Sequence, residues 1–233
     1  MANPSNHGAT VAFDIEVAGL EWEKLDEATR GYLLERARTE EDRAHVPDRL
    51  ALFPGCGQIV AIALFNLDEM RGAVLHEGAD PRWQPWPGRS DGTWVYQGTE
   101  ADMLSAFWER MRHYGRLISF CGRTYDGPVL MIRSAMLGIP PSRNLVPPRY
   151  QSMQHLDLME VLTFQGAVRE KFSLEYWCRR FDVESPKVTL DGSQVQRAYG
   201  EGRITTIADY CLRDARATAE LFLKLEKTLV PLF

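Results

Sequence analysis

Apolar and acidic positions alternate clearly in one short stretch near the start of the chain. Residues 11–17 read Val-Ala-Phe-Asp-Ile-Glu-Val, with both acidic residues at even positions. Because side chains of a strand point to opposite faces in turn, Asp14 and Glu16 share one face. The pattern predicts a strand with one apolar face and one acidic face.

The segment after this strand has a different character. About residues 21–49 are charged and favour helix, and Leu33, Leu34 and Ala37 are their few periodic apolar positions. We expect a helical insertion here, ended by the Pro and Gly residues of the segment 53–57.

Two apolar runs follow, at residues 58–65 and 72–77, and their spacing predicts a strand hairpin. Residues 78–93 are rich in Pro, Gly and Trp without any period, which is typical of a loop.

The rest of the chain alternates between strand and helix patterns. Strands are expected at 94–96, 117–121 and 155–158, helices at 100–114, 128–137, 173–181, 193–199 and about 205–229, and a Pro-rich connector at 138–154. This order predicts an α/β fold, a mixed sheet flanked by helices, in a single domain covering residues 1–233.

Composition narrows the function classes. No stretch approaches the roughly 18 apolar residues of a membrane span, and the first residues lack the features of a signal peptide, so we expect a soluble, cytoplasmic protein with no membrane partner. The four cysteines show no paired spacing and are expected to be reduced. A net charge of −5 argues against a protein that coats nucleic acid, but not against a cation-binding enzyme. The sequence has no Gly-rich phosphate loop, which argues against functions that use a dinucleotide or a nucleoside triphosphate.

Asp14 and Glu16 are the first candidate functional residues. Two carboxylates on one face of a buried strand repel each other, and hard cations such as Mg²⁺ or Mn²⁺ would relieve that cost. A sheet face open to water would explain the same two residues, so the pair alone leaves both interpretations open.

Asp126 is the second candidate. It follows a strand that breaks at Gly122, and it precedes Pro128, where a helix is expected to begin. The residue could cap that helix. It also stands at the carboxyl end of a strand, where open α/β sheets place their ligands.

Tyr210 and Asp214 form the third element. They are four residues apart in the last predicted helix, and they share its apolar face with Ile207, Cys211 and Leu221. An aspartate on an apolar stripe is seldom buried without a partner, which favours a ligand role.

Taken together, these segments resemble a known family. FDIE, GRTYDGPVL and YCLRD, in this order, look like the three exonuclease motifs of the DEDD superfamily, in the variant with Tyr in the third motif. The likeness is to the proofreading exonuclease domain of B-family DNA polymerases and its stand-alone bacterial relatives. It covers most of residues 11–229, and segments 155–158, 172–175 and 191–195 add to it.

The resemblance implies a ribonuclease H-like fold and a 3′-5′ exonuclease that hydrolyses DNA to nucleoside 5′-monophosphates with two Mg²⁺ or Mn²⁺ ions. Asp14, Glu16, Asp126 and Asp214 would bind the metals, and Tyr210 would orient the attacking water. The partner would be a nucleic acid 3′ end. An exoribonuclease of the same superfamily and a catalytically silent nucleic-acid-binding module are the alternatives.

Further positions are weaker candidates for contact with nucleic acid. Cys121 and Gly122 belong to the second motif, although many relatives have Asn in place of Cys121 and Thr in place of Val17. Arg123 and Lys187 resemble phosphate-contacting residues, and Lys171 is a similar candidate.

Asp157 either lies near the site or caps a turn. Trp83 and Trp86 either pack under their loop or stack on bases. The insertion at 21–49 would be a lid, a dimer surface or a guide for nucleic acid.

Overall fold

One seven-stranded sheet forms the centre of the structure. The computed structural model describes residues 8–148, 154–185 and 190–233. The strands lie in the order β4-β5-β3-β2-β1-β6-β7. Their bounds are β1 Ala9–Gly19, β2 Gly57–Asn66, β3 Arg71–Glu77, β4 Gln84–Pro85, β5 Trp94–Gly98, β6 Tyr114–Ser119 and β7 His155–Asp157.

The sheet is mixed, as the sequence predicts. β1 pairs antiparallel with β2 and parallel with β6, while β2 and β3 form the expected antiparallel hairpin. The β3–β5 and β6–β7 pairs are parallel. The position of β1 near the middle of the sheet places its acidic residues between two layers of helices.

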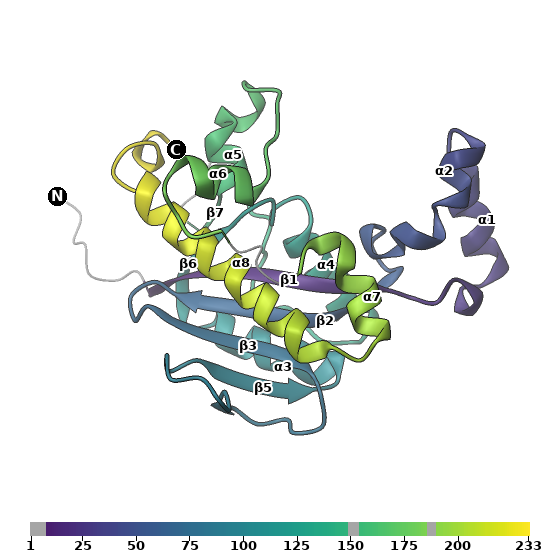
Figure 1. The fold of residues 1–233 in the computed structure, drawn as a ribbon, viewed down its shortest axis with the longest axis horizontal. Helices are drawn as coiled ribbons and strands as arrows, with labels where there is room; N and C mark the ends of the chain where they lie inside the picture. The colour runs from purple at the N-terminus through teal and green to yellow at the C-terminus, as the bar shows by residue number, and fades with distance from the viewer. Residues whose placement is uncertain (1–7, 149–153, 186–189) are drawn as a thin grey trace.

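Helices cover both faces of the sheet (Figure 1). α8 crosses one face over β1, β2 and β3, and α3 packs on the opposite face. The remaining helices lie around these two. The bounds are α3 Glu100–Met111, α4 Asp126–Met136, α5 Leu158–Leu162, α6 Leu174–Arg180, α7 Val195–Gly200 and α8 Ile204–Leu225.

The two faces of β1 belong to different cores. Val11, Phe13, Ile15 and Val17 pack with the apolar residues of α3 and α4. On the other face, Ala12 and Ala18 pack with residues of α8. Small side chains there let the α8 backbone come close to the sheet, and Asp14 and Glu16 occupy the same face between the two alanines.

The insertion after β1 is helical but broken into short pieces. These are η1 Trp22–Lys24, α1 Glu27–Glu35, α2 Glu40–Ala44 and η2 Pro47–Leu52. The Asp26 side chain accepts a hydrogen bond from the Thr29 amide, and Thr39 does the same for Asp42, so each cap starts a new helix. A separate small cluster of Leu33, Val46, Leu50 and Cys56 holds these pieces together; η2 packs against β1 and β2, while α1 and α2 extend away from the main sheet (Figure 1).

Some elements differ from those the sequence indicates. The short strand β4, the helix α5 and the 3-10 turn η4 Phe164–Gly166 were not predicted, and the helix expected at 193–199 is divided into the 3-10 turn η5 Gly192–Gln194 and α7. α8 ends at Leu225, and only the 3-10 turn η6 Val230–Leu232 follows it. Ser173 caps α6 as expected, accepting from the Tyr176 amide.

The two tryptophans of the 78–93 loop pack against the protein. Trp86 is buried, and the Arg89 guanidinium lies over its ring at 5.2 Å from the centroid. Trp83 contacts the Tyr96 ring at 5.4 Å between centroids and Arg110 at 4.0 Å. The packing interpretation is therefore confirmed for both.

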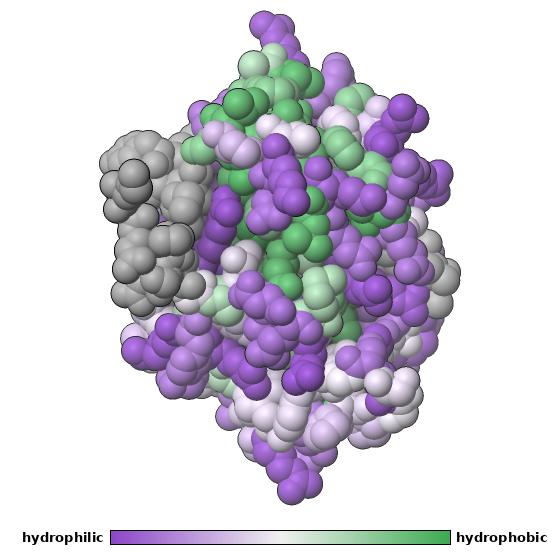
Figure 2. Space-filling model, turned by 90° about the vertical axis from the view of Figure 1, so that its left-hand side faces the viewer, coloured by the Kyte–Doolittle hydropathy of each residue, from purple (hydrophilic) through white to green (hydrophobic). Residues whose placement is uncertain are grey.

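The surface carries apolar as well as charged areas. In Figure 2, hydrophobic residues gather in the upper half of the face shown, between hydrophilic ones. Exposed large apolar residues include Phe164 and Leu232, and the Phe164 ring lies 6.0 Å from that of Phe233. Among the helices of the described residues, none combines the length and apolar character needed to cross a membrane.

Candidate active site

The carboxylates of Asp14, Glu16, Asp126 and Asp214 form a cluster, called the acidic centre, whose first two members lie on β1. Asp14 and Glu16 point to the α8 face, and a register shift follows directly after Glu16, where the pairing with β2 changes. Such a bulge bends a strand and turns its side chains, and bulges are common beside active sites. On α8, Tyr210 and Asp214 lie one turn apart and face these carboxylates.

Crowding and burial disturb the ionisation of these acids. Burial first, and then the charges of Asp214 and Asp126, raise the pKa of Asp14 and of Glu16 well above their ordinary values. Within the described residues, no Lys or Arg forms an ion pair with Asp14, Glu16 or Asp126, and the buried Oδ2 of Asp14 has no hydrogen-bond partner. Four carboxylates from three distant segments therefore share one buried region, in which their charges raise one another's pKa.

Asp126 reaches this region from the start of α4. Of the two roles that the sequence left open for Asp126, the structure does not show helix capping, because α4 begins at Asp126 itself and Tyr125 occupies the cap position without a side-chain bond. Asp126 is 5% exposed. Burial, followed by the charge of Asp157, raises its pKa to about 8. The side chain is thus available to the acidic centre.

Asp157 organises the loop that carries Asp126. Its carboxylate accepts hydrogen bonds from the Cys121 amide at 2.9 Å and the Arg123 amide at 3.0 Å, and it also caps α5 through the Met159 amide. The sequence left its role open between site and cap, and the structure shows a cap that also fixes the β6–α4 loop. Its position at the end of a strand that runs parallel to β6 was the feature of the sequence that could have indicated a place beside the β6–α4 loop.

Cys121 and Gly122 shape this loop. Cys121 has a φ of 64°, in the left-handed region that non-Gly residues seldom adopt. Asn adopts that region more readily, which gives a physical reason for Asn in relatives at this position. Gly122 lies against Asp126, because a Cβ there would be 2.9 Å from Asp126 Oδ2.

Replacing Gly122 should damage both the fold and the site. A Cβ would lie 2.5 Å from the Cβ and Oγ of Ser119, so Gly122→Ala should lower stability by about 1–3 kcal/mol, as overpacking does. Thermal unfolding of Gly122→Ala measures the loss. Gly31→Ala in α1 is the control, since nothing lies within 4 Å of a Cβ there. Equal melting temperatures for Gly122→Ala and the wild type would contradict the close packing.

The basic candidates occupy different environments. Arg123 is buried, its Nη2 donates to the Pro147 carbonyl at 2.6 Å, and its Nε lies 3.2 Å from Glu160. A direct phosphate contact would have to break these interactions. Burial, followed by the charges of Asp157 and Asp126, raises the pKa of the Cys121 thiol to about 12, and the charge of the exposed Lys171 acts weakly in the opposite direction. Lys187 lies outside the described residues.

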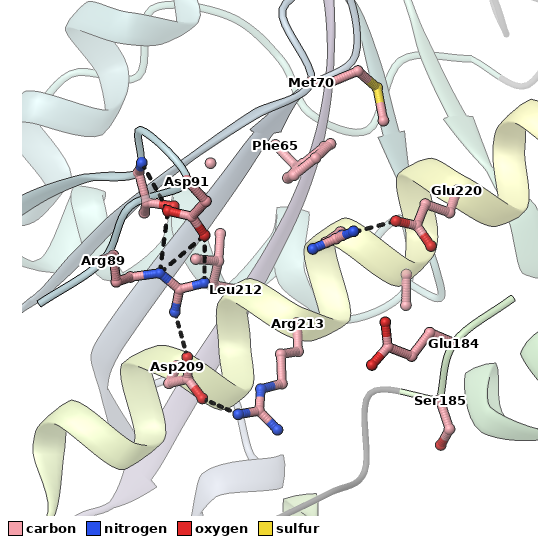
Figure 3. Close-up of a pocket in the computed structure, with 14 residues that line it drawn as sticks. Phe65, Met70, Arg89, Asp91, Glu184, Ser185, Asp209, Leu212, Arg213 and Glu220 are labelled. Atoms are coloured by element: carbon pink, nitrogen blue, oxygen red, sulfur yellow. Dashed lines mark hydrogen bonds and ion pairs between the residues drawn. The ribbon is translucent and has the colours of Figure 1, made fainter. Parts of the chain in front are cut away.

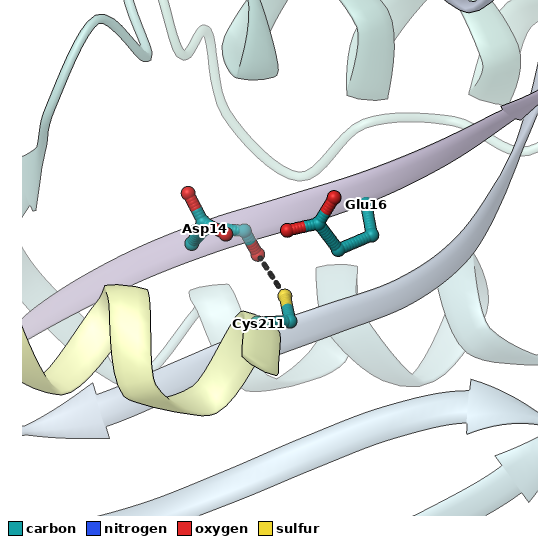
Figure 4. Close-up of side chains that lie close together, drawn as sticks. All are labelled: Asp14, Glu16 and Cys211. Atoms are coloured by element: carbon teal, nitrogen blue, oxygen red, sulfur yellow. Dashed lines mark hydrogen bonds between the residues drawn. The ribbon is translucent and has the colours of Figure 1, made fainter. Parts of the chain in front are cut away.

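Two residues of α8 complete the centre. The Tyr210 hydroxyl is hydrogen-bonded to Asp214, and burial together with the charge of Asp214 raises its pKa, so the phenol stays protonated. Cys211 is fully buried and donates from Sγ to the Asp14 carbonyl oxygen at 3.4 Å (Figure 4). Sequence reasoning placed Cys211 on the apolar face but gave it no function. Its place directly after Tyr210 was the only signal.

A pocket of about 600 Å³ lies elsewhere, between α8 and the β2–β3 hairpin, and the loop that carries Arg89 and Asp91 also lines it (Figure 3). Arg89 donates to Asp91 and Asp209, Arg213 pairs with Asp209, and Arg216 pairs with Glu220. The arginines that line it are therefore already bonded to carboxylates. None of the expected catalytic residues lines this pocket, so the acidic centre remains the candidate active site.

Fold and site together define the class: an α/β protein of the ribonuclease H-like type with an acidic centre on its first strand and last long helix. The chain belongs to the family of predicted 3′-5′ exonucleases related to the exonuclease domain of PolB, whose model matches residues 93–229. That match includes Asp126, Tyr210 and Asp214, while Asp14 and Glu16 precede it.

A solved structure supports the fold. The family B DNA polymerase from the hyperthermophilic archaeon Pyrobaculum calidifontis is similar with a TM-score of 0.57 and 18% identity, covering 97% of this chain. This chain spans 25% of the length of that polymerase. No curated protein matches the sequence.

Proposed function

We propose that this 3′-5′ exonuclease acts on DNA 3′ ends, releases nucleoside 5′-monophosphates and uses two divalent cations, Mg²⁺ or Mn²⁺. The observation that carries the proposal is the convergence of Asp14, Glu16, Asp126 and Asp214 in one buried region, where burial and the charges of neighbouring carboxylates raise the pKa of Asp14, Glu16 and Asp126. DNA is the favoured substrate because the family is related to the exonuclease domain of a polymerase.

The side chains present suit such ions. Hard divalent cations prefer carboxylate oxygen, and the buried Asp14 Oδ2, which has no partner among the described residues, is available as a ligand. Asp14, Glu16, Asp126 and Asp214 would hold the ions. When bound, the ions would supply charge stabilisation and activate water for an in-line displacement at phosphorus.

The protein's own groups would orient the reaction. The protonated Tyr210 hydroxyl is a donor beside Asp214, suited to holding the attacking water in line with the terminal phosphodiester. Asp157 is a positioning residue that keeps the Asp126 loop in place. Lys171 would contact a backbone phosphate at the rim.

The reaction is tested directly with 5′-labelled oligonucleotides. Single-stranded and 3′-recessed duplex substrates, each as DNA and RNA, are incubated with the protein and Mg²⁺, Mn²⁺ or EDTA. A metal-dependent ladder that shortens from the 3′ end, fastest on DNA, is expected. Faster RNA cleavage would favour the exoribonuclease alternative. No cleavage by folded protein with Mn²⁺ would favour the silent binding module.

Tyr210→Phe should slow turnover by about 10- to 100-fold while metal binding changes little, since orientation of a reactant is lost but no carboxylate is removed. Single-turnover rates at saturating Mn²⁺, with Mn²⁺ affinity measured by calorimetry, separate the two effects. Tyr199→Phe is the matched control, because its hydroxyl pairs with Gln58 outside the acidic centre. An unchanged Tyr210→Phe rate would remove the phenol from the proposed mechanism.

A further inference from the structure

The acidic centre contains a sulfur atom that the proposed reaction does not use. Cys211 Sγ and one carboxylate oxygen each of Asp14 and Glu16 all lie within 4.8 Å of one another. Figure 4 shows the two carboxylates on β1 next to the thiol on α8. Cys56 belongs to the insertion cluster and Cys178 packs with Val183 and Ala217, so neither shares this arrangement.

The surroundings of the sulfur indicate a ligand set. Glu16 is 9% exposed, and no described residue donates a hydrogen bond to its carboxylate. Asp14 Oδ2 is buried and likewise has no partner within the described part of the chain. The Cys211 thiol donates to the Asp14 backbone carbonyl at 3.4 Å and also interacts with the Asp14 carboxylate. Two oxygen ligands and one sulfur ligand therefore face one another.

These three atoms match the requirements of a soft cation. Zn²⁺ takes tetrahedral sites built from thiolate and carboxylate, in which neighbouring ligand atoms lie roughly 3.5 Å apart. The present separations are at most 4.8 Å, so shifts of about 1 Å would bring the three atoms to that spacing. Mg²⁺ has little affinity for sulfur, so the thiol distinguishes the two kinds of ion.

We propose that Asp14, Glu16 and Cys211 form a mixed carboxylate–thiolate site that captures thiophilic cations such as Zn²⁺ or Cd²⁺. As the sulfur–metal bond forms, the thiol proton passes to solvent and the hydrogen bond to the Asp14 carbonyl is lost. The consequence for activity rests on the proposed function: the captured ion blocks hydrolysis, because it occupies the carboxylates that Mg²⁺ or Mn²⁺ would bind. The protein is thus inhibited by ions that bind its own active-site sulfur.

Cobalt binding tests the ligand set without any substrate. Titration of the full-length protein with Co²⁺ should give a sulfur-to-cobalt charge-transfer absorption that Cys211→Ser loses and that Cys56→Ala keeps. Cd²⁺ affinity, from calorimetry, should fall by about tenfold or more in Cys211→Ser, since even residues behind the ligands change metal affinity by roughly 10–100-fold. Glu16→Gln should weaken Cd²⁺ binding too, because the sulfur and the carboxylate share one ion.

The outcomes separate this proposal from the proposed function. Bound Co²⁺ without the charge-transfer band, or an equal band in Cys211→Ser, would overturn the sulfur site. The band in a protein that cleaves no nucleic acid would keep the sulfur site and remove the nuclease proposal. With an active protein, the Zn²⁺ concentration that halves the Mg²⁺-supported rate should rise about tenfold in Cys211→Ser. Circular dichroism checks that this variant is folded.

Discussion

Asp14→Asn should abolish hydrolysis and, at the same time, make the metal-free protein more resistant to unfolding. The activity loss should reach at least roughly a hundredfold, the loss that removal of a single transition-state-stabilising group causes in other enzymes. Stability should rise because Asp14 lies among Glu16, Asp126 and Asp214, whose charges repel it. An amide of the same shape carries no charge, and its N–H₂ group can donate to the neighbouring carboxylates.

Thermal unfolding in EDTA measures the stability effect. Each kcal/mol changes the melting temperature by about 2–4 °C in a protein of this size, so a rise of a few degrees is expected. Asp209→Asn on α8 is the matched control, because Asp209 bonds to Arg89 and Arg213 at 2.6 Å each. That variant should melt lower and still hydrolyse DNA. A lower melting temperature for metal-free Asp14→Asn would show that Asp14 is well compensated without metal.

The sequence predicted those parts of the candidate site in which the regular repeat of a strand or a helix determines which side chains share a face. Alternation in β1 placed Asp14 and Glu16 on one face, and the four-residue spacing placed Tyr210 and Asp214 on one side of a helix. Both relations depend only on local backbone geometry, so no knowledge of the tertiary structure was needed. The mixed sheet and the β2–β3 hairpin followed in the same way from apolar runs.

What the sequence left open depends on tertiary contacts. Asp126 was compatible with a cap until the structure showed the helix beginning at that residue. Asp157 bonds to amides 34 and 36 residues away, which no local pattern encodes. Arginine is usually exposed, so the sequence did not predict that Arg123 is buried with its guanidinium in contact with Pro147 and Glu160. Cys211 becomes notable only when α8 is placed over β1.

The insertion illustrates a different limit. Its helix-favouring composition predicted helix correctly, but Asp26 and Thr39 each begin a new helix through side-chain caps. Tyr125, beside Asp126, donates from its hydroxyl to the Ala51 carbonyl at 2.7 Å and so joins the insertion to the active-site loop. Composition therefore predicts that the segment is helical. The side-chain caps determine where its helices begin, and the Tyr125 contact determines where it packs on the rest of the protein.

The metal-free protein should lose stability as the pH rises from about 7 to 9, and Mn²⁺ should reverse that loss. Burial, with the charge of Asp157 second, raises the pKa of Asp126 to about 8 in the folded protein, far above its value in an unfolded chain. A raised carboxyl pKa contributes stability that is complete at low pH and is lost as the pH passes the folded value. Below the folded pKa the native state holds more protons than the unfolded state, so the free energy of unfolding falls by up to about 1.4 kcal/mol per pH unit for each proton, and this fall levels off above the folded pKa.

The histidines set the lower limit of this window. Burial lowers the pKa of His155 to about 4, and that of His76 in the same direction, so both favour the folded state increasingly as the pH rises. Their contribution is nearly complete above the ordinary histidine pKa of about 6.5. Above about pH 8 the four cysteines, whose thiol pKa burial raises, add a loss of the same sign, because the thiols of an unfolded chain ionise first. The part of the loss that Asp126→Asn removes is therefore the part that belongs to this carboxylate.

Chemical denaturation in EDTA at pH 7, 8 and 9 should give falling free energies of unfolding for the wild type and a flatter dependence for Asp126→Asn. Mn²⁺ binds the deprotonated carboxylates, so its stabilising effect should grow over the same range. A wild-type protein whose metal-free stability is constant or rises from pH 7 to 9 would show that Asp126 is ionised at neutral pH. The negative slope, its loss in Asp126→Asn and its reversal by Mn²⁺ would together tie the cost of the acidic centre to the cations that it is proposed to bind.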